Sequence, residues 1–298
     1  TPKQLLPLVA GRSLLRLAFE RSLASVPAER VLVVTGAGYA AEVAAQLPEL
    51  PAANILGEPV GRDSLNACAW PAAVLAATDP DAVIAQLTAD QLIEPVDVFA
   101  ASLETAFALA EADPGVLVTL GVVPTSPHTG YGYLHRGEPI SGYAGAHRVL
   151  RFVEKPSREV AEGYLASGDF WWTSGMFVWR AATLLEQLRL LLPATHTAVL
   201  DLAAHPGRLE EIFPALFKTS VDYAGMEPVS AGQGSARVVA VALPVDWRDV
   251  GGFASLAEIL PTDPAGNATS GRVVSLDAPG NIVVNADADS LLALLGVS

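Results

Sequence analysis

Short apolar runs alternate with longer segments of helical periodicity over most of the chain. The runs are rich in β-branched residues, which is typical of buried strands. We expect strands at 30–35, 54–57, 83–90, 116–123, 149–155 and 237–243. We expect helices at 13–25, 39–47, 65–77, 98–112, 157–165 and 181–191, and over part of 194–217. Strands and helices that alternate in this way are typical of the α/β class.

The predicted fold is a Rossmann-like, mostly parallel mixed sheet flanked by helices. A further helix is expected over 253–260. Two or three short β segments follow, at 272–276, 281–285 and 291–295. We therefore expect one α/β domain over residues 1–262 and the start of a short C-terminal β segment over 263–298. The aromatic stretch 170–179 should pack as core, with a polar interruption at 173–175.

Composition narrows the class of protein. The net charge of −14 argues against a surface that binds nucleic acid. No apolar run is long enough to span a membrane. The single cysteine, Cys68, rules out an internal disulfide and favours a cytoplasmic location. Only three lysines occur, against fifteen arginines, so Lys3, Lys155 and Lys218 mark places where a compact ammonium is favoured over a planar guanidinium.

Two carboxylates follow predicted strands. Asp90 ends the stretch 83–90, and Asp249 lies just beyond the strand at 237–243. In open α/β sheets, ligands bind at the carboxyl ends of the strands. The alternative for Asp90 is an N-cap of the following helix, because aspartate is favoured there.

Two loops carry candidate binding residues. Glu58, Gly61 and Arg62 precede a predicted helix and suit an anion or a base, although a plain turn with a solvated arginine is the alternative. Gly130 and Tyr131 lie where glycines alternate with aromatic residues, which suits a sugar ring or a base. A glycine-kinked edge strand would produce the same pattern.

Glu154 and Lys155 end a predicted strand directly before Pro156. Neighbouring side chains on a strand point to opposite faces. We therefore expect that these two residues do not form an ion pair with each other. One side chain should face a ligand, and the other should lie in the wall of the site behind it.

Eight segments in order carry a family resemblance. They are Pro2–Pro7, Glu58–Asp63, Leu87–Asp90, Thr129–Tyr133, Phe152–Pro156, Trp172–Phe177, Val221–Glu227 and Trp247–Gly251. Together they resemble the sugar-nucleotide pyrophosphorylase family, and within it the mannose-1-phosphate guanylyltransferases. The resemblance implies that GTP and mannose 1-phosphate react with Mg²⁺ to give GDP-mannose and pyrophosphate. A homodimer is a further expectation, separate from the resemblance.

The resemblance implies roles at the phosphates and the metal. Asp90 and Asp249 would hold Mg²⁺, with Asp90 also at the nucleotide. Lys3 would meet the triphosphate. These three residues, Lys3, Asp90 and Asp249, are the expected catalytic group.

The resemblance also implies roles at the base and the sugar. Glu58, Gly61 and Arg62 would lie at the guanine. The sugar phosphate would be bound by Gly130, Tyr131, Glu154, Lys155 and Thr173, with Glu154 on the sugar hydroxyls and Lys155 on the phosphate.

The chain departs from the family at several positions. Gln91 stands where histidine is usual, Thr173 where asparagine is usual, and Leu65-Asn66 replaces small residues. The family's first strand and glycine-rich loop would precede Thr1, and we expect both to be missing from this sequence, as we expect the C-terminal segment to be truncated. The alternatives are therefore a pyrophosphorylase for another hexose 1-phosphate or a non-catalytic paralogue that binds nucleotide sugars.

Two rival sites are weaker. Asp287-Ala-Asp289 has the spelling of a glycosyltransferase metal motif but lies in the terminal β segment. The five histidines show no metal-ligand spacing and no arrangement for nucleophilic catalysis.

Overall fold

The computed structural model describes residues 2–9, 11–252, 255, 257, 260–285, 287 and 289–297. The chain divides into two compact units, which we describe separately. The terminal unit comprises Thr1–Leu23, Thr88–Glu94 and Asp246–Ser298, and the central unit comprises Ala24–Leu87 and Pro95–Val245.

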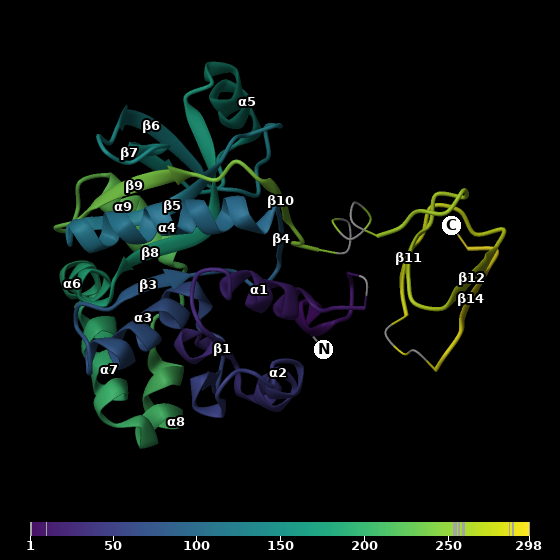
Figure 1. Ribbon diagram of the computed structural model, residues 1–298, viewed down its shortest axis with the longest axis horizontal. Coiled ribbons are helices and arrows are strands. Elements are labelled where there is room, and N and C mark those ends of the chain that lie inside the picture. The colour runs from purple at the N-terminus through teal and green to yellow at the C-terminus, as the bar shows by residue number, and fades with distance from the viewer. Residues whose placement is uncertain are drawn as a thin grey trace. The chain divides into compact units, whose positions relative to one another are not determined.

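The central unit contains most of the helices and the largest sheet (Figure 1). Its helices are α2 (Ala40–Gln46), α3 (Asp63–Ala76), α4 (Val96–Ala112), α5 (Arg158–Ser167), α6 (Ala181–Leu191), α7 (Pro193–Ala204), α8 (Leu209–Ile212) and α9 (Glu227–Ser230). Its strands are β1 (Val33–Gly36), β2 (Ile55–Glu58), β3 (Val83–Gln86), β5 (Val116–Val122), β6 (Tyr133–Pro139), β7 (Ala146–Val153), β8 (Phe170–Arg180) and β9 (Arg237–Ala242). The six predicted strands correspond to β1, β2, β3, β5, β7 and β9.

The six-stranded sheet of the central unit closes on itself. Its order is β3-β8-β5-β9-β7-β6, and β6 also pairs with β8. The long strand β8 makes this possible, because Phe170–Trp172 pair with β6 while Phe177–Arg180 pair with β3. Strands β8, β5, β9, β7 and β6 therefore form a small mixed barrel.

The predicted mixed α/β fold is confirmed, but the predicted majority of parallel pairs is wrong for this sheet. Among its described pairings only β5–β9 is parallel. β1 and β2 form a separate parallel pair. Two of the antiparallel partners, β6 and β8, were not predicted as strands, so their pairings could not be anticipated.

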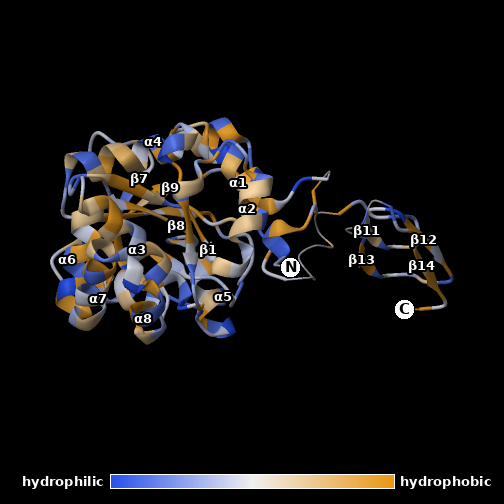
Figure 2. Cartoon of the chain, turned by 90° about the horizontal axis from the view of Figure 1, so that it is seen from below, coloured by the Kyte–Doolittle hydropathy of each residue, from blue (hydrophilic) through white to orange (hydrophobic). Residues whose placement is uncertain are grey.

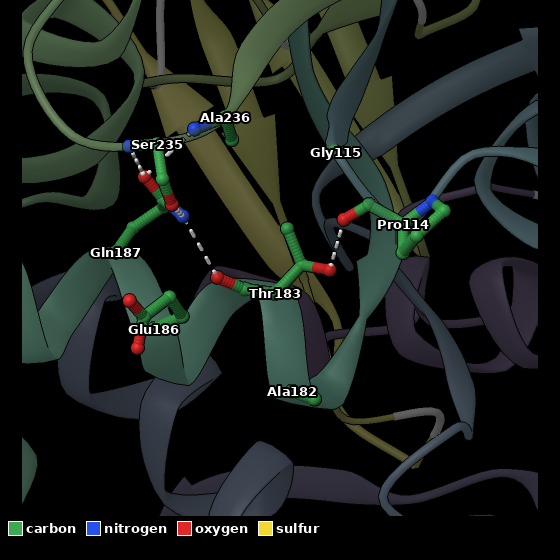
Figure 3. A pocket seen from close by; sticks show the side chains of 8 residues that line it. All are labelled: Pro114, Gly115, Ala182, Thr183, Glu186, Gln187, Ser235 and Ala236. Carbon is green, nitrogen blue, oxygen red and sulfur yellow. Dashed lines mark hydrogen bonds between the residues drawn. The ribbon is translucent and has the colours of Figure 1, made fainter.

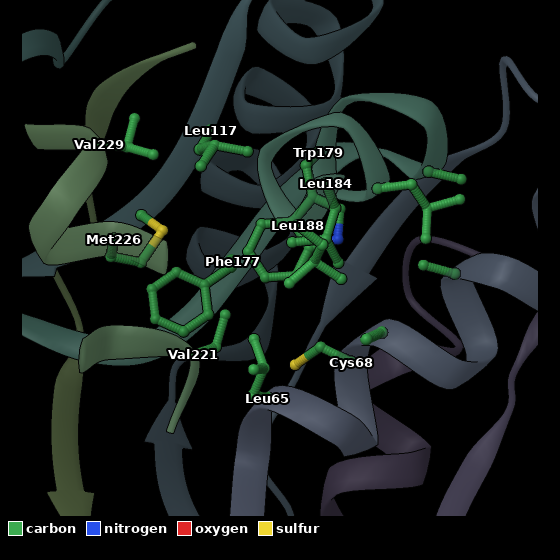
Figure 4. Close-up of a cluster of buried hydrophobic side chains, with 14 of the residues drawn as sticks. Leu65, Cys68, Leu117, Phe177, Trp179, Leu184, Leu188, Val221, Met226 and Val229 are labelled. Carbon is green, nitrogen blue, oxygen red and sulfur yellow. The ribbon is translucent and has the colours of Figure 1, made fainter. Parts of the chain in front are cut away.

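The sheet is covered on both faces. Helix α4 packs on β3, β5, β8 and β9, whereas α6 packs on β5 and β8 and also contacts α3 and α7. Leu117, Phe177 and Trp179 join the cluster that includes residues of α3 and α6 (Figure 4). Their strand neighbours Val118 and Val178 are equally buried but belong to the other face. Burial on both faces explains the continuous apolar runs, and Figure 2 shows the hydrophobic colour along β8 and β9.

The stretch predicted as aromatic core is confirmed as buried, but it is a strand. Gly175 has a φ of +71°, which interrupts the regular ladder. Two hydroxyls compensate locally: Gly175 N donates to Thr173 Oγ1 at 3.3 Å, and Met176 N donates to Ser174 Oγ at 3.3 Å. The polar interruption at 173–175 therefore satisfies backbone groups within the strand.

The terminal unit contains the short helix η1 (Lys3–Leu5), α1 (Leu14–Ser22) and a pair of antiparallel strands, β4 (Gln91–Glu94) and β10 (Asp246–Asp249). Its remaining strands are β11 (Ala268–Ser270), β12 (Val273–Leu276), β13 (Ile282–Val284) and β14 (Leu292–Leu295). β11 pairs with β13 and β12 with β14, both in parallel, so the chain makes two successive turns of a coil. The three predicted C-terminal strands are confirmed as β12, β13 and β14.

The coil depends on a glycine at one tight turn. Gly271 has a φ of +84°, and a Cβ at this position would lie 2.2 Å from the carbonyl oxygen of Asn285. Only glycine combines this φ with so close a backbone approach.

Two further predictions concern helices. The helix expected at 253–260 lies outside the described residues, apart from 255, 257 and 260. None of the helices in the described ranges is both long and apolar enough to cross a bilayer.

Candidate functional site

The terminal unit brings Lys3 onto Asp90. Lys3 Nζ lies 3.1 Å from Asp90 Oδ2, and the two side chains are 28% and 27% exposed. The ammonium also donates to the carbonyl oxygen of Val250, and Gln4 Nε2 lies 3.4 Å from Asp90 Oδ2. The Asp90 carboxylate is therefore paired with the Lys3 ammonium, at a position that is partly open to solvent. It does not cap a helix, because β4 follows it directly and the next helix, α4, has Pro95 as its N-cap.

The backbone of Asp249 lies close to that of Asp90, because β10 pairs with β4. Asp249 is the ladder partner of Gln91 in the β4–β10 pair, and Val250 N donates to Asp90 O at 3.0 Å. The three residues predicted as catalytic, Lys3, Asp90 and Asp249, thus lie in one unit although they are far apart in sequence.

Three buried or half-buried side chains that were not predicted as site residues hold this strand pair in place. Trp247 Nε1 donates to Gln91 Oε1 at 3.0 Å. Arg21, on α1, donates to the carbonyl oxygens of Gln91 at 3.2 Å and Thr88 at 3.3 Å. Burial lowers the pKa of Arg21 to about 10, so it is still charged at neutral pH. Gln91 stands where the family resemblance would place a histidine. Its side chain accepts the hydrogen bond from Trp247 that holds β4 against β10.

The donor set in the terminal unit suits a cation that phosphate oxygens help to hold. Across the described residues, no three His, Cys, Asp or Glu side chains gather as a metal site. Asp90 and Asp249 carry the hard oxygen donors that were predicted for the metal, and Mg²⁺ is usually bound by one or two carboxylates together with substrate phosphates and water.

In the central unit, Glu154 and Lys155 pair with each other, so the expectation that they do not is wrong. Lys155 Nζ lies 3.2 Å from Glu154 Oε1. The physical reason is that β7 ends at Val153 and Lys155 has a φ of +46°, so the alternation of a strand no longer applies. The Glu154 side chain is 9% exposed and that of Lys155 is 55% exposed.

The pair combines a buried carboxylate with a solvent-exposed ammonium, and this shifts the pKa of both groups. Burial raises the pKa of Glu154, the Lys155 ammonium lowers it by less, and Glu227 raises it further. Burial disfavours the charge on Lys155, but Glu154, Tyr223 and Asp222 outweigh this and raise its pKa. Lys155 is therefore protonated at neutral pH, and its side chain is accessible to solvent.

Tyr131 belongs to a small aromatic group. Its ring stacks on His128 at 3.9 Å between centroids and meets Trp172 edge-on at 5.2 Å. His128 Nδ1 lies 3.1 Å from Gly130 N, which donates to it. The alternative of a kinked edge strand is wrong, because these residues precede β6 and β6 pairs with both β7 and β8.

Gly132 brings two of the predicted sugar contacts side by side. A Cβ on Gly132 would lie 2.5 Å from Glu154 Oε2 and 2.6 Å from Thr173 Cγ2. Both groups therefore pack against the bare backbone of Gly132. Thr173 N donates to Gly132 O at 2.9 Å, which fixes this contact.

Glu58, Gly61 and Arg62 lie where β2 leads into α3. Burial raises the pKa of Glu58 to about 7, and its Oε1 is buried without a hydrogen-bond partner among the described residues. Arg62 donates to the carbonyl oxygen of Pro214. The alternative of a solvated arginine is therefore wrong, whereas Gly61 is exposed with open space around it.

Asp222 is a buried acid that the sequence prediction did not select as a site residue, although it lies in the quoted Val221–Glu227 motif. It begins a short π-helix, Asp222–Met226, and Val221 N before it donates to Ser64 Oγ at 3.1 Å. Burial raises the pKa of Asp222 to about 7, and Glu154 contributes in the same direction.

Asp222 should make the protein less stable as the pH rises. The folded state holds its proton up to about pH 7, whereas the unfolded chain releases it near pH 3.8. Its contribution to stability is therefore full below about pH 4, falls between these values and levels off above about pH 7. We expect Asp222→Asn to raise the midpoint of thermal unfolding at pH 8 and to reduce its change between pH 5 and pH 8.

Thermal unfolding at both pH values measures this effect. The exposed Asp169→Asn should keep the wild-type change between pH 5 and pH 8. An unaltered pH dependence in Asp222→Asn would mean that Asp222 is ionised in the folded protein.

A hollow of about 190 Å³ in the central unit is a poor candidate site (Figure 3). It lies at the amino ends of β5 and β9, opposite to the edge where ligands usually bind. The amide of Gln187 in its wall is fully used: Nε2 donates to Thr183 O and Ser235 Oγ, and Oε1 accepts from Ser235 N and Ala236 N. This hollow therefore reflects packing of α6 against the loop before β9.

Asp287 and Asp289 form a turn between β13 and β14, with Asp289 N donating to Asp287 Oδ1 at 3.0 Å. These two residues therefore have a local structural role in the turn.

Comparison with known proteins gives consistent matches. A family model described as Nucleotidyl transferase matches residues 1–265. The xanthan biosynthesis protein XanB of Xanthomonas campestris pv. campestris (strain B100) is 38% identical over 307 residues, which is 99% of this chain and 62% of that protein. Mannose-1-phosphate guanylyltransferase of Klebsiella pneumoniae is 38% identical, over 99% of this chain and 63% of that protein. The chain thus spans about three fifths of the length of these relatives.

A solved structure is similar over the whole chain. The crystal structure described as mannose-1-phosphate geranyltransferase from Thermus thermophilus superposes with a TM-score of 0.81 and 33% sequence identity. The similarity covers 100% of this chain and 84% of that chain.

Proposed function

The chain belongs to the nucleotidyl transferase family, and on this premise we propose that it transfers the guanylyl group of GTP to mannose 1-phosphate. An oxygen of the sugar phosphate attacks the α-phosphorus of GTP. The bond from this phosphorus to the oxygen that bridges to the β-phosphate breaks, and GDP-mannose and pyrophosphate form. The names of the relatives support these substrates.

One observation carries the proposed reaction class: Lys3, Asp90 and Asp249 gather in the terminal unit. Lys3 is paired with Asp90 at 3.1 Å, and Asp249 lies on the adjoining strand. When a triphosphate binds, the Lys3 ammonium contacts the phosphate oxygens instead of Asp90. The Asp90 carboxylate is then available, together with that of Asp249, to hold Mg²⁺. Positioning and charge neutralisation of this kind supply most of the catalysis in nucleotidyl and phosphoryl transfer.

The family is typically dependent on a metal, and Mg²⁺ is the ion that suits the carboxylates Asp90 and Asp249. When bound, Mg²⁺ neutralises charge on the phosphates that react. Arg21, Gln91 and Trp247 hold the two strands that carry the carboxylates.

The central unit supplies the contacts to the sugar and the base. Glu154 accepts sugar hydroxyls, and Lys155 binds the sugar phosphate with Gly130, Tyr131 and Thr173 nearby. The buried Oε1 of Glu58 is an acceptor suited to an N–H group, so Glu58, Gly61 and Arg62 bind the guanine.

The remaining assignments belong to the same proposal. The boundary between an α/β domain, 1–262, and a C-terminal β segment, 263–298, is supported by the end of the family match at residue 265. A cytoplasmic location is supported by the single, buried Cys68. A homodimer is the assembly that we propose to test by measuring the molar mass in solution.

The test is release of pyrophosphate by the full-length protein. We expect release only when GTP, mannose 1-phosphate and Mg²⁺ are present together, with ATP, CTP and UTP as control nucleotides. Turnover with a different hexose 1-phosphate only would favour the alternative pyrophosphorylase. Binding of GDP-mannose without turnover under any condition would favour a non-catalytic paralogue.

A further inference from the structure

The loop that we propose for the base is held against a second segment of the central unit. The loop ends at the start of α3, and the second segment, 214–221, lies directly before the π-helix Asp222–Met226. Leu65 and Val221, one from each side, lie in the same buried cluster (Figure 4). We call the hydrogen bonds between residues 62–66 and the segment 214–221 the clamp.

Asn66 lies at the centre of the clamp. It is completely buried. Its Nδ2 donates to the carbonyl oxygen of Arg62 at 2.8 Å and to that of Phe217 at 2.9 Å. A carbonyl oxygen can only accept, so the two protons of this one amide group join the loop to the second segment. Alanine at this position would leave both carbonyl oxygens without this donor.

The two residues before Asn66 add to the clamp. Leu65 N donates to Thr219 O at 3.2 Å, and Ser64 Oγ accepts from Val221 N at 3.1 Å. The N–H groups in the first turn of a helix have no partner within the helix, and Thr219 satisfies one of them from outside. The start of α3 is therefore capped by the second segment, because the side chain of its N-cap residue makes no capping hydrogen bond.

The turn that leads into the clamp is strained. Asp63 has a φ of +67°, a conformation that a residue other than glycine keeps only when its surroundings impose it. Arg62 is held at both ends, because its carbonyl oxygen accepts from Asn66 and its guanidinium donates to the carbonyl oxygen of Pro214. Gly61, directly before it, is exposed, with no atom within 4 Å of a Cβ built there. The clamp thus fixes a turn whose backbone is open to a ligand.

We propose that Asn66 is a positioning residue for the nucleotide, which holds Arg62 and the strained turn in the conformation that binds the base. The inference rests on the proposed function, which places Glu58, Gly61 and Arg62 at the guanine. Without Asn66, the turn relaxes and has the binding conformation for only a fraction of the time. The apparent affinity for the nucleotide falls by that fraction, whereas the complex, once formed, is the same. The loss therefore appears in KM for GTP and not in kcat.

The experiment compares the steady-state kinetics of the full-length wild type with those of Asn66→Ala in the presence of Mg²⁺. We expect KM for GTP to rise about tenfold, as when the turn is competent for roughly a tenth of the time. KM for mannose 1-phosphate and kcat should stay within about twofold of the wild type, because uniform loss of nucleotide binding changes neither.

Ser64→Ala is a second variant that disturbs the same clamp less. It removes the acceptor of Val221 N and leaves the buried amide of Asn66 in place. We expect KM for GTP to rise about threefold, again without a change in kcat. This variant decides the question if Asn66→Ala does not fold.

Gln187→Ala is the matched control, because Gln187 is also a buried helical amide that joins its helix to a distant segment. Its side chain binds Ser235 and Ala236 in the loop before β9. The control should lower the midpoint of thermal unfolding, as Asn66→Ala does, and leave both KM values unchanged. The proposal is overturned if the folded clamp variants keep the wild-type KM for GTP, or if Gln187→Ala raises this KM equally.

Failure of the proposed function gives a different result, namely no turnover with any sugar phosphate. Calorimetric titration of the wild type with GTP, ATP, CTP and UTP then takes the place of KM. Weaker binding of the preferred nucleotide in Asn66→Ala, but not in Gln187→Ala, supports the positioning role. Equal binding by the wild type and Asn66→Ala contradicts it, as does a wild type that binds none of the four nucleotides.

Discussion

Replacing Asp249 by asparagine should lower the rate of pyrophosphate release by roughly 100-fold or more, because the change removes one of two charged oxygen donors for the metal. The fold should survive. Val250 N still donates to Asp90 O, and Trp247 still donates to Gln91, so the β4–β10 pair keeps its fastening. Turnover should also require a higher Mg²⁺ concentration, since the remaining donors bind the ion more weakly.

Asp246→Asn is the matched control, because Asp246 is the first residue of the same strand and pairs with Arg248 at the surface. It should retain wild-type turnover. Steady-state assays over a range of Mg²⁺ concentrations, with thermal unfolding of both variants, complete the test. Near-normal turnover in Asp249→Asn would show that the metal is held elsewhere.

Replacing Gly132 by alanine should lower kcat/KM for mannose 1-phosphate by roughly 100-fold, the scale expected when a binding group is displaced by about 1 Å. The new Cβ would lie 2.5 Å from Glu154 Oε2 and 2.6 Å from Thr173 Cγ2. The carboxylate ends a flexible side chain and can move away, whereas Thr173 is buried in β8, so thermal unfolding of the variant must be measured beside its activity. The movement takes Glu154 from its place beside Lys155.

The control for this variant is Gly163→Ala in α5. No atom lies within 4 Å of a Cβ built at Gly163, and alanine is favoured over glycine inside a helix by about 0.5–1 kcal/mol. Gly163→Ala should therefore unfold at a higher temperature and keep the wild-type kcat/KM. If Gly132→Ala also keeps it, Glu154 has no part in binding the sugar phosphate.

Local patterns predicted much of the molecule. Helix α6 has the bounds, Ala181–Leu191, that its periodicity predicted, and strands such as β5 and β9 lie within the apolar runs. Such patterns depend only on neighbouring residues. The strand β8 was missed as a strand because its aromatic run contains the polar segment at 173–175, whose hydroxyls bond within the strand.

The candidate residues were found by other signals. Asp90 and Asp249 follow predicted strands, and Lys3 is one of three lysines, but only the family resemblance gave these residues their roles, and Asp90 had the alternative of a helix N-cap. Arg21 carried no such signal, and Asp222 had only its place in the Val221–Glu227 motif. Arg21 has the pattern of an ordinary helix residue, and the burial that perturbs Asp222 arises only when its loop packs against α3.

By itself, the sequence determined the α/β class, most helices and buried strands, and the residue types available for phosphate, metal and sugar contacts. Only the tertiary structure decided that the large sheet closes through β6 and β8, that Lys3 lies on Asp90, and that Glu154 pairs with Lys155. The physical reason is the same in each case. Periodicity is a local property, whereas strand partners, ion pairs and the left-handed turn at Lys155 depend on residues that meet only after the chain has folded.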